Sequence, residues 1–460
     1  MNILYNTGIR LYGLAAKITS LRSAKVKKMI KGQRRTIETL RRRLGNRPGC
    51  IWFHASSLGE FEQGRPMIER LRREHPEKPI LLTFFSPSGF EVRKNYPFAD
   101  AVVYLPFDTP HRVRRFLDAA RPSMAIFIKY EFWGNYLHEL RRRGIPTYII
   151  SSIFRPGQRF FRSVGGMFRR MLKCFDHLYV QDERSRRLLK LIGVENVTVA
   201  GDTRFDRVTD VMRSTVDIPG FPGFGKDAPL RFIAGSSWEA DEDVYVPWLN
   251  IRADVAFIIA PHEFNETRLE ALRNRFNGKV LLLSEWTNVI KRARLPQGQL
   301  PEELKDVRGL IIDSFGKLSS LYRYADVAYI GGGFGAGIHN LNEAAVYGMP
   351  VIFGPNHIKF KEASDLMEVG GGFSVAGKEE FMQTISVLTS SPQALRSAGE
   401  VAGQYIKVHL GATDLIYNDL FGPNVVAERL DKASAAPKPD KATAVSNAYQ
   451  AASGKEKKKK

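Results

Sequence analysis

The sequence predicts an α/β protein with two Rossmann-like domains that face each other across a cleft. Short apolar runs rich in β-branched residues recur from residue 51, and helical patterns separate them, which is typical of parallel sheets covered by helices. The stretch "VDIPGFPGFGKDAP" (216–229) interrupts this alternation with Pro and Gly, after which the same pattern begins again. At 460 residues, the chain is also too long for one hydrophobic core.

The apolar runs give the order of the predicted strands. In the first array they cover 51–55, 80–85, 101–106, 124–128, 147–151, 177–181 and 197–202, with helical patterns over 111–120 and 134–143. In the second array they cover 231–236, 255–260, 279–284, 309–313, 327–332 and 351–355. We therefore expect a first domain over 48–215, a linker over 216–229 and a second domain over 230–430.

Most of the positive charge lies at the two ends of the chain. The net charge is +21, of which +12 falls in residues 1–47 and +5 in residues 431–460, so residues 48–430 carry only +4. A basic groove for nucleic acid would lie in the folded body, so we expect no nucleic-acid partner. Residues 431–460 are of low complexity and are expected to form a disordered basic tail.

Residues 1–47 combine an apolar helical face with a polybasic segment. The apolar face carries Leu4, Leu11, Leu14 and Ile18. Arg10 and Lys17 interrupt any apolar run of the roughly 18 residues that a spanning helix needs. This pattern favours a helix that lies on an anionic membrane surface, although a solvated helix packed on the body is the alternative. Two cysteines without metal-ligand spacing, and no secretory signal, indicate a reducing compartment.

The first predicted strand leads to a single carboxylate. In "IWFHASSLGEFEQG", from residue 51, small residues connect the strand to Glu60 at the start of a helix. Ser57 and Glu60 have the spacing of a capping box, in which each side chain bonds a free backbone N–H. Ligands also bind at the carboxyl ends of parallel strands, so Glu60 has a functional interpretation as well. Pro66 either starts or kinks this helix.

A Gly-rich loop follows a strand of the second domain, in "ADVAYIGGGFGAGIHNLNEAAVYGMPVIFGPN" (325–356). Backbone N–H groups around Gly331–Gly333 can form an anion site, and Asn340 or Asn342 can cap the next helix. The loop matches a dinucleotide fingerprint only loosely, because it lies in the fifth strand–helix unit of its domain. The missing Walker loop disfavours P-loop ATP chemistry.

Several motifs recur in a fixed order along the chain. They are "HASSLGE" (54–60), "TFFSPSGFEV" (83–92), "YLPFDTP" (104–110), "RPSMAIFIKYEFWGN" (121–135), "GDTRFD" (201–206), "IAGSSWEADED" (233–243), "DSFGKL" (313–318), "GGGFGAGIHNLNEAA" (331–345) and "GPNHIKF" (354–360). From about residue 50 to 420, the chain resembles the 3-deoxy-D-manno-octulosonate (Kdo) transferases of lipopolysaccharide assembly.

The resemblance implies a GT-B fold and an inverting transferase that needs neither a bound metal nor a cofactor. The donor would be CMP-Kdo, bound by the second domain, and the acceptor a lipid A precursor, bound by the first. A membrane-borne acceptor also implies that residues 1–47 place the enzyme on the cytoplasmic face of the inner membrane, as a peripheral or monotopic protein.

The resemblance carries the catalytic base onto Glu60. Inverting transfer needs a carboxylate to remove the proton of the attacking hydroxyl, and a helix start is expected to keep Glu60 ionised. Glu131 matches the second acid of a motif that usually reads Glu-x-Glu-x-Trp, but here Lys129 takes the first position. We expect Glu131 to orient the acceptor or another group. The acceptor-side candidates are Ser57, Ser86, Lys129 and Arg155, with Arg159 as an alternative to Arg155.

The donor-side candidates come from three segments of the second domain. They are Ser236, Ser237, Trp238, Glu239, Pro261, His262, Gly332, Gly333, His339, Asn340, Glu343, Gly354 and Asn356. The segment "IAPHEFNE" stands where the family usually has Pro-Arg-His-Pro-Glu-Arg, so both arginines are missing. We expect Lys359 or Lys361 to meet the phosphate or the Kdo carboxylate instead.

Two other interpretations stay open on the sequence alone. One is a nucleotide-sugar epimerase of the same two-domain architecture, which would use UDP and no membrane. The other is a non-enzymatic protein that binds a membrane or nucleic acid through its basic ends.

Overall fold

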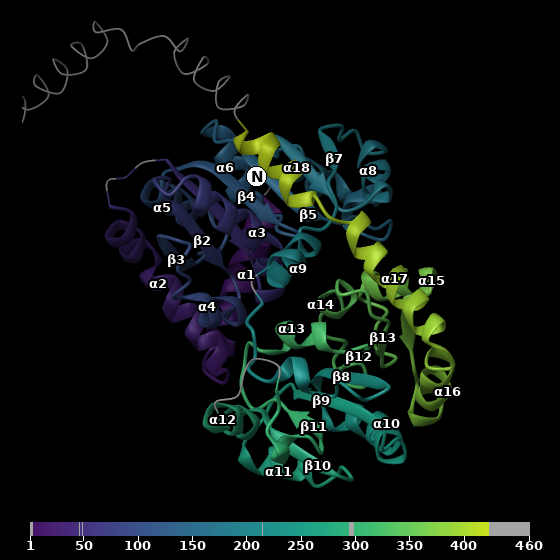
Figure 1. Cartoon of the computed structure of the whole chain (residues 1–460). Helices are drawn as coiled ribbons and strands as arrows, with labels where there is room; N and C mark the ends of the chain where they lie inside the picture. The colour runs from purple at the N-terminus through teal and green to yellow at the C-terminus, as the bar shows by residue number, and fades with distance from the viewer. Residues whose placement is uncertain (1–2, 46, 48, 214, 294–298, 423–460) are drawn as a thin grey trace, which may run out of the picture. The chain divides into compact units, whose positions relative to one another are not determined.

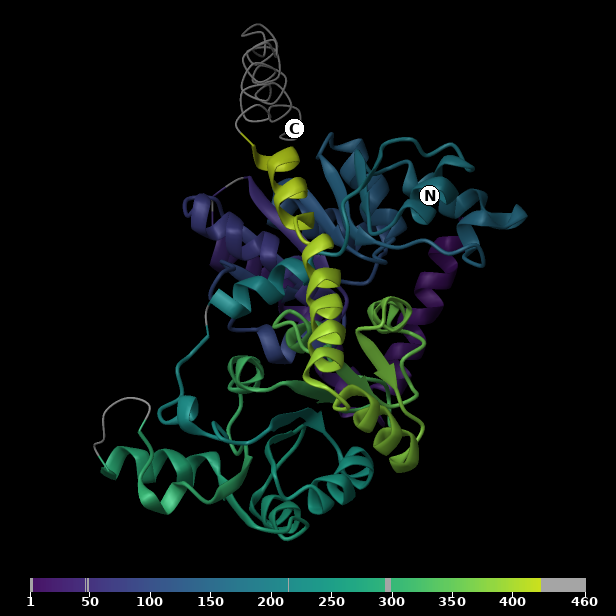
Figure 2. The same cartoon turned by 45° about the vertical axis from the view of Figure 1, so that its right-hand side comes forward.

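A computed structural model describes residues 3–45, 47, 49–213, 215–293 and 299–422 of the chain. Two parallel seven-stranded sheets form its framework, and helices flank the strands of each sheet (Figures 1 and 2). The predicted α/β fold with two Rossmann-like domains is confirmed. Helix α18 (Ala412–Phe421) belongs to a separate unit that begins at Thr413. The predicted tail, 431–460, lies outside the described residues.

The first sheet has the strand order β3-β2-β1-β4-β5-β6-β7, with every neighbouring pair parallel. Its strands are β1 (Cys50–Ala55), β2 (Ile80–Phe84), β3 (Ala101–Tyr104), β4 (Pro122–Ile128), β5 (Thr147–Ser152), β6 (His177–Val180) and β7 (Val197–Val199). All residues of β1 and β2 are buried, which explains their continuous apolar runs. The strand order reverses between β1 and β4, so a crevice is expected at their carboxyl ends.

Nine helices surround this sheet in the described part of the chain. They are α1 (Ile3–Thr19), α2 (Ala24–Leu44), α3 (Leu58–Glu74), α4 (Pro87–Arg93), α5 (Pro110–Ala120), α6 (Gly134–Arg142), α7 (Gly166–Leu172), α8 (Glu183–Lys190) and α9 (Arg204–Arg213). The helical patterns over 111–120 and 134–143 are confirmed by α5 and α6. Pro66 lies inside α3 and not at its first turn, so it removes one helical hydrogen bond.

The second sheet has the order β10-β11-β9-β8-β12-β13-β14 and is also parallel throughout. Its strands are β8 (Leu230–Ser237), β9 (Val255–Pro261), β10 (Lys279–Leu282), β11 (Val307–Ile311), β12 (Val327–Ile330), β13 (Val351–Phe353) and β14 (Gly372–Ser374). Its helices are α10 (Glu239–Ile251), α11 (Glu266–Arg273), α12 (Leu283–Ala293), α13 (Leu318–Leu321), α14 (Asn342–Ala345), α15 (Lys361–Val369), α16 (Lys378–Leu388) and α17 (Pro392–Val408). The reversal of strand order falls between β8 and β12.

The stretch 216–229 packs on the second domain. Ile218, Phe221 and Phe224 are buried in the core that contains Trp286. The Trp286 indole N–H donates a hydrogen bond to the Pro219 carbonyl at 3.1 Å. This part of the chain is therefore held by side-chain packing.

The N-terminal helix α2 is part of the first domain's core. Leu40 and Leu44 are buried there, and the Thr36 hydroxyl donates to the Tyr104 carbonyl at 2.8 Å. A Cβ atom at Gly32 would lie 2.2 Å from the Tyr104 ring, so α2 approaches β3 closely. Within the described residues, no helix combines the length and the apolar character needed to cross a bilayer.

Helix α1 is attached to the same domain through Asp108, which is buried. The Tyr5 hydroxyl donates to Asp108 Oδ2 at 2.6 Å and accepts from the Gly134 N–H at 3.0 Å. The N–H groups of Asn135 and Tyr136 each donate to Asp108 at 2.9 Å. Asp108 therefore caps the start of α6 from a distant part of the chain, because Trp133 at the N-cap position makes no such bond.

We predict that Asp108→Ala lowers the free energy of unfolding by about 2–4 kcal/mol, because it leaves buried N–H groups of α6 without an acceptor. Urea denaturation followed by circular dichroism measures the change. The control is Asp118→Ala, which removes an exposed carboxylate paired with Arg143 and should cost less than about 1 kcal/mol. Equal losses in the two variants would contradict the capping role of Asp108.

Candidate active site

Glu60 lies in the first turn of α3, directly after β1. The capping box is confirmed: Ser57 N–H donates to Glu60 Oε2 at 3.0 Å, and Ser57 Oγ accepts from the Glu60 N–H at 3.5 Å. Burial, followed by the charge of Glu131, raises the pKa of Glu60 to about 6, against the N–H groups of Ser57 and Ser56. Burial therefore outweighs the helix start in setting the pKa, although a carboxyl with a pKa of about 6 is still mostly ionised at neutral pH. A carboxylate with this pKa exchanges a proton near neutral pH.

Glu131 follows β4, and only 5% of its surface is exposed. Its Oε2 accepts from His54 Nε2–H at 2.9 Å and from the Trp133 indole N–H at 2.5 Å. Burial opposes ionisation, but the hydrogen bond and charge of His54, helped by Ser56 and Trp133, outweigh it and lower the pKa of Glu131. Glu131 therefore stays ionised next to a Glu60 that binds a proton more readily.

His54 connects Glu131 to the neighbouring strand β2. An ionised carboxylate only accepts, so Nε2 carries the hydrogen in the His54–Glu131 contact. The other ring nitrogen, Nδ1, lies 2.8 Å from Thr83 Oγ1, which also accepts from the Trp52 indole N–H at 2.8 Å. Both ring nitrogens are thus engaged, and the imidazole orientation is fixed. His54 sets the position of Glu131 relative to the catalytic candidate Glu60.

The other acceptor-side candidates lie at the carboxyl ends of β2, β4 and β5. Ser86 caps α4, and its N–H donates to the Ser56 carbonyl at 2.8 Å, which joins the two loops. Lys129 has a left-handed backbone, with φ of 65°, directly after β4. Burial, and next the charge of Arg204, lowers the pKa of Lys129. Arg155 is exposed and lines the same cavity as Lys129.

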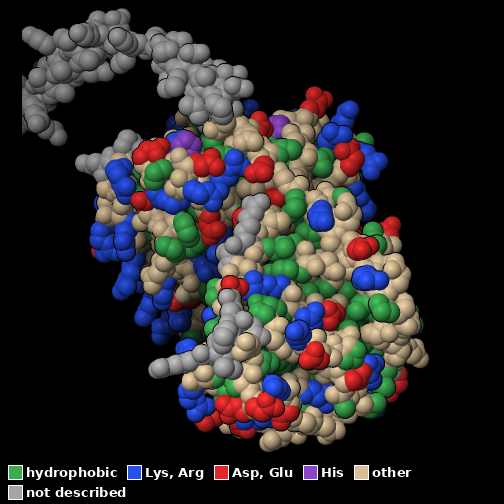
Figure 3. Space-filling model, in the orientation of Figure 1, with side chains coloured by type: hydrophobic (Ala, Val, Ile, Leu, Met, Phe, Trp, Pro, Cys, Tyr) green, Lys and Arg blue, Asp and Glu red, His purple; other side chains and the backbone are tan. Residues whose placement is uncertain are grey.

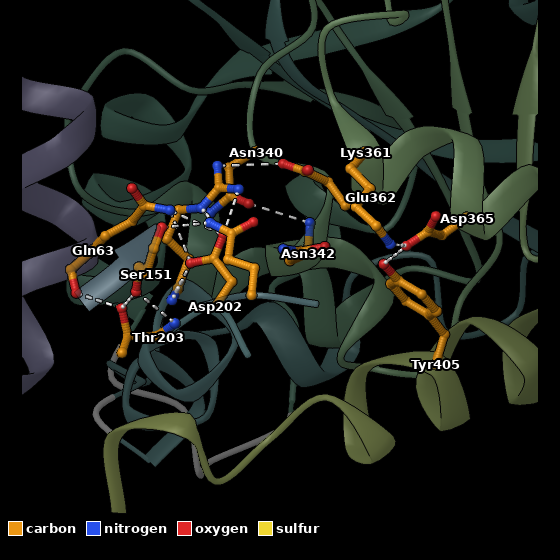
Figure 4. Close-up of polar contacts among 12 residues, drawn as sticks. Gln63, Ser151, Asp202, Thr203, Asn340, Asn342, Lys361, Glu362, Asp365 and Tyr405 are labelled. Carbon is orange, nitrogen blue, oxygen red and sulfur yellow. Dashed lines mark hydrogen bonds and ion pairs between the residues drawn. The ribbon is translucent and has the colours of Figure 1, made fainter. Parts of the chain in front are cut away.

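This cavity, of about 150 Å³, is lined by both domains. Its cations are Lys129, Arg155, Arg204, Lys359 and Lys361. The Arg204 guanidinium donates to Asp202 Oδ2 at 2.8 and 3.0 Å and pairs with Glu362 of α15 at 3.3 Å. Gln63 of α3 also donates to Asp202 at 3.0 Å (Figure 4). Lys359 and Lys361, which we expected to replace the missing arginines, therefore both line this cavity. The ion pairs of Arg204 with Asp202 and Glu362 connect its walls.

Three aromatic side chains of the donor side form one stack. The rings of His262 and His339 are stacked 4.3 Å apart, and Trp238 lies 4.6 Å from His262. Burial and the nearby His262 lower the pKa of His339 to about 4, so its imidazole is neutral. His339 Nε2 accepts from the Trp238 indole N–H at 3.4 Å. Trp238 is 40% exposed, and an open aromatic face of this kind can stack on a nucleobase.

The Gly-rich loop follows β12 as predicted, but two of its amides are already used. Gly332 N–H donates to the buried Asp241 at 2.8 Å, and Gly331 N–H donates to the Gly235 carbonyl at 2.9 Å. Neither amide is available to an anion, so the predicted anion site is wrong for these two groups. Asp241 also accepts from Trp238 N–H at 2.9 Å, and therefore holds the loop against β8.

Gly354 and Asn356 shape this loop from the side of β13. A Cβ atom at Gly333 would lie 2.5 Å from the Gly354 backbone, so both positions need glycine. Asn356 N–H donates to the Gly333 carbonyl at 2.9 Å, and its side chain donates to the Gly335 carbonyl at 2.8 Å. These contacts place Gly354 and Asn356 in the framework of the loop.

The remaining predicted donor residues have structural partners at the same sheet edge. The Asn340 amide donates to Glu343 at 3.0 Å, and its oxygen accepts from the Asn342 N–H at the start of α14, whose N-cap position is Leu341. Ser236 has a left-handed backbone, with φ of 54°. The further contacts are Ser237 with Glu242 at 3.4 Å, Glu239 with Arg268 at 3.5 Å, Glu343 with Ser319 at 2.5 Å, and Pro261 beside Ser237 at the end of β9.

Sequence reasoning missed three residues that organise the site: His54, Asp202 and Asp241. His54 was visible as one polar residue in an apolar strand, and Asp241 follows Trp238 by the three residues of a helix cap. Asp202 has one local partner, Arg204, but its contact with Gln63 joins segments far apart in the sequence. The further contact of Arg204 with Glu362 is also distant, so no local pattern predicts this network. Across the described ranges, no group of three or more His, Cys, Asp or Glu is placed to hold a metal ion.

Known proteins resemble this chain in sequence and in fold. The family model of 3-deoxy-D-manno-octulosonic-acid transferase (kdotransferase) matches residues 32–207. A 3-deoxy-D-manno-octulosonic acid transferase of Aquifex aeolicus is 26% identical over 377 residues, which cover 79% of this chain and 94% of that protein. Its counterpart from Haemophilus influenzae is 26% identical and covers 82% of this chain and 87% of its own.

Similarity to solved structures supports the fold alone. The structure of Staphylococcus aureus MnaA with UDP matches with a TM-score of 0.50 and 13% identity, over 82% of this chain and 97% of that one. A UDP-GlcNAc 2-epimerase from Neisseria meningitidis gives a TM-score of 0.50 and 14% identity, over 78% and 97% of the two chains.

Two parallel α/β domains, each with a switch point in its sheet, form a fold of the GT-B type. The sequence relatives indicate that the enzyme is a glycosyltransferase. The sequence relatives extend across both domains and agree on one family. The family model and these relatives support the 3-deoxy-D-manno-octulosonic acid transferase family for this chain.

We predict that Glu131→Gln lowers the pKa of Glu60 toward the ordinary value of a glutamate, because it removes the negative charge that opposes ionisation of Glu60. Carboxyl ¹³C chemical shifts recorded between pH 4 and pH 8 measure this titration. Glu62→Gln, on the same helix and paired with Arg93, is the control and should leave the Glu60 titration in place. A Glu60 pKa that stays the same or rises in Glu131→Gln would refute the proposed coupling.

Proposed function

We propose that this enzyme transfers Kdo from CMP-Kdo to a lipid A precursor with inversion, using Glu60 as the general base. The observation that carries the proposal is the pair of carboxylates at the β1/β4 switch point, whose pKa values shift in opposite directions. Glu60 can accept a proton near neutral pH, while Glu131 stays charged.

The transfer step is a single displacement. Glu60 removes the proton from the acceptor hydroxyl as that oxygen attacks the anomeric carbon of Kdo. The new carbon–oxygen bond forms as the bond to the CMP phosphate breaks, so the configuration inverts and the phosphate takes the electron pair. The negative charge of Glu131 also favours the positive character that develops on the sugar in the transition state.

The donor would lie between the aromatic stack and the cationic cavity. The exposed face of Trp238 suits the cytosine base, with His262 and the neutral His339 behind it. Lys359 and Lys361 supply positive charge for the phosphate or for the Kdo carboxylate. Backbone amides contribute less than expected, because Asp241 already occupies Gly332 N–H.

The membrane part of the proposal concerns α1, which would place the enzyme on the cytoplasmic face of the inner membrane. Tyr5 turns one face of α1 toward the protein, and the large apolar side chains of the other face are exposed. They are Ile3, Leu4, Leu11, Leu14 and Ile18, followed by Leu21 just after the helix, and all are at least 56% exposed. Lys and Arg side chains gather over the neighbouring α2 (Figure 3). An apolar face beside a basic one suits the boundary of an anionic lipid surface.

The proposed base is tested with Glu60→Gln. We expect the fold to be preserved, because Gln also serves in a capping box, and transfer of Kdo to fall by at least ~10²-fold. Mass spectrometry of the acceptor, with CMP-Kdo generated in the reaction, measures turnover. Ser57→Ala is the control, because it breaks the cap, at a cost of about 1 kcal/mol, and keeps the carboxylate. If both variants lost only a small and similar part of their turnover, Glu60 would act as a helix cap and not as the base.

The proposed membrane contact is tested with the double variant Leu11→Glu/Leu14→Glu. We expect binding to anionic vesicles to fall by at least ~10²-fold, since each buried Leu contributes about 1.5–3 kcal/mol and each added charge is repelled. Vesicle co-sedimentation measures binding. The control is Leu191→Glu/Ile251→Glu, which makes the same change at positions exposed by 81% and 67% elsewhere on the protein. Equal loss of binding in both proteins would exclude α1 as the contact.

A further inference from the structure

A second cavity, of about 320 Å³, lies between α1, α2 and the start of α5. It shares no lining residue with the Glu60 site or with the cationic cavity. Four cations line it: Lys17, Arg34, Arg112 and Arg115. No acidic residue is among its lining residues, and none of the four cations forms an ion pair with another described residue. All four are exposed at the rim of the cavity, where an anionic ligand can reach them.

The cavity also contains a buried amide with no partner. Gln33 of α2 is only 7% exposed, and neither its Oε1 nor its Nε2 has a hydrogen-bond partner among the described residues. An unpaired buried polar atom destabilises the folded protein, because it has lost its hydrogen bonds to water. One turn further along α2, the buried Thr36 hydroxyl is satisfied by the Tyr104 carbonyl at 2.8 Å. Gln33 differs from Thr36 because it lines the cavity, where a ligand can supply the missing partner.

The remaining wall is apolar. It consists of Ile30, Ile37, Pro106 and Phe107. The Arg112 guanidinium lies 5.6 Å from the centre of the Phe107 ring, so charge and apolar surface adjoin. Inorganic phosphate would use the cations and leave this wall uncovered. An amphiphile with a phosphate at one end would use both.

We propose that this pocket binds the phosphate monoester headgroup of a lipid. Arg112, Arg115 and the other cations would hold the phosphate, the Gln33 Nε2–H would donate to one of its oxygens, and Phe107 would cover the glycerol or the first carbons of the chains. The position fits a lipid, because Lys17 belongs to α1, the helix whose outer face exposes Leu14 and Ile18. The site is additional to the transfer reaction and does not rest on Glu60.

The test uses the full-length protein and monomeric dihexanoyl phosphatidic acid below its micelle concentration, measured by isothermal titration calorimetry. We expect it to bind at least ~10-fold more tightly than inorganic phosphate, because only the lipid covers the apolar wall. Dihexanoyl phosphatidylcholine should bind at least ~10-fold more weakly than phosphatidic acid, because its phosphate is a capped diester. Equal affinity for phosphatidic acid and inorganic phosphate would overturn the lipid assignment, and so would equal affinity for the two lipids.

Variants separate this pocket from general charge attraction. Arg112→Gln should weaken phosphatidic acid binding by about 10-fold or more, which is typical of a lost hydrogen bond to a charged group. Arg114→Gln removes an equal charge from the same helix at a position that does not line the cavity, and should change binding by less than about 2-fold. If the two substitutions weakened phosphatidic acid binding equally, the lipid phosphate would not bind in this pocket.

Gln33→Leu distinguishes a ligand contact from a structural role. The substitution removes the unpaired polar atoms, so thermal stability should stay the same or rise. Phosphatidic acid binding should nevertheless fall by about 5-fold or more. Unchanged binding would overturn the role of Gln33. Because the probe is monomeric, vesicle docking by α1 and transfer at Glu60 can each fail without affecting the result.

Discussion

The reversal of strand order beside one central strand is the constraint on which both halves of the site depend. In the first sheet it separates the loops after β1 and β4, and these loops carry Glu60 and Glu131. In the second sheet it separates the loops after β8 and β12, which carry Trp238 and the glycines from Gly331. Parallel strands all end at one edge of a sheet, so the topology itself gathers these side chains. The loops can then differ in chemistry while the strands stay apolar.

Glu60 and Glu131 lie at the same switch point, and the first domain stabilises the ionised form of only one of them. Like charges oppose each other's ionisation, and burial opposes both. His54 and Trp133 give their hydrogen bonds to Glu131 alone, so the unfavourable energy falls on Glu60. Glu60 keeps only backbone partners from its own helix cap. Glu60 can therefore serve both in the capping box and as a base. The cap orients the carboxylate, and the pKa of Glu60 stays above that of an ordinary glutamate.

The strands and the helix cap were predictable because their signals are local. Apolar runs located the strands of both sheets, and the spacing of Ser57 and Glu60 located the cap. The contacts of His54 with Glu131, 77 positions apart, depend on which strands become neighbours, and no local pattern contains that information. The raised pKa of Glu60 could not be predicted for the same reason, since burial is a tertiary property. The motif after β12 predicted a loop correctly, but not that Asp241 would use one of its amides.

The helices that precede the first sheet are connected to the site by a short series of contacts. Tyr5 of α1 bonds Asp108, and Asp108 caps the start of α6. Trp133, at the N-cap position of the same helix, donates to Glu131. In the proposed membrane contact, α1 attached in this way cannot swing freely relative to Glu131, because both depend on the position of one helix start. In the proposed reaction, an acceptor held at the lipid surface would have to reach Glu60 at a fixed height above that surface. A rigid attachment of α1 meets this requirement, whereas a flexible tether would leave the distance between the surface and the base unset.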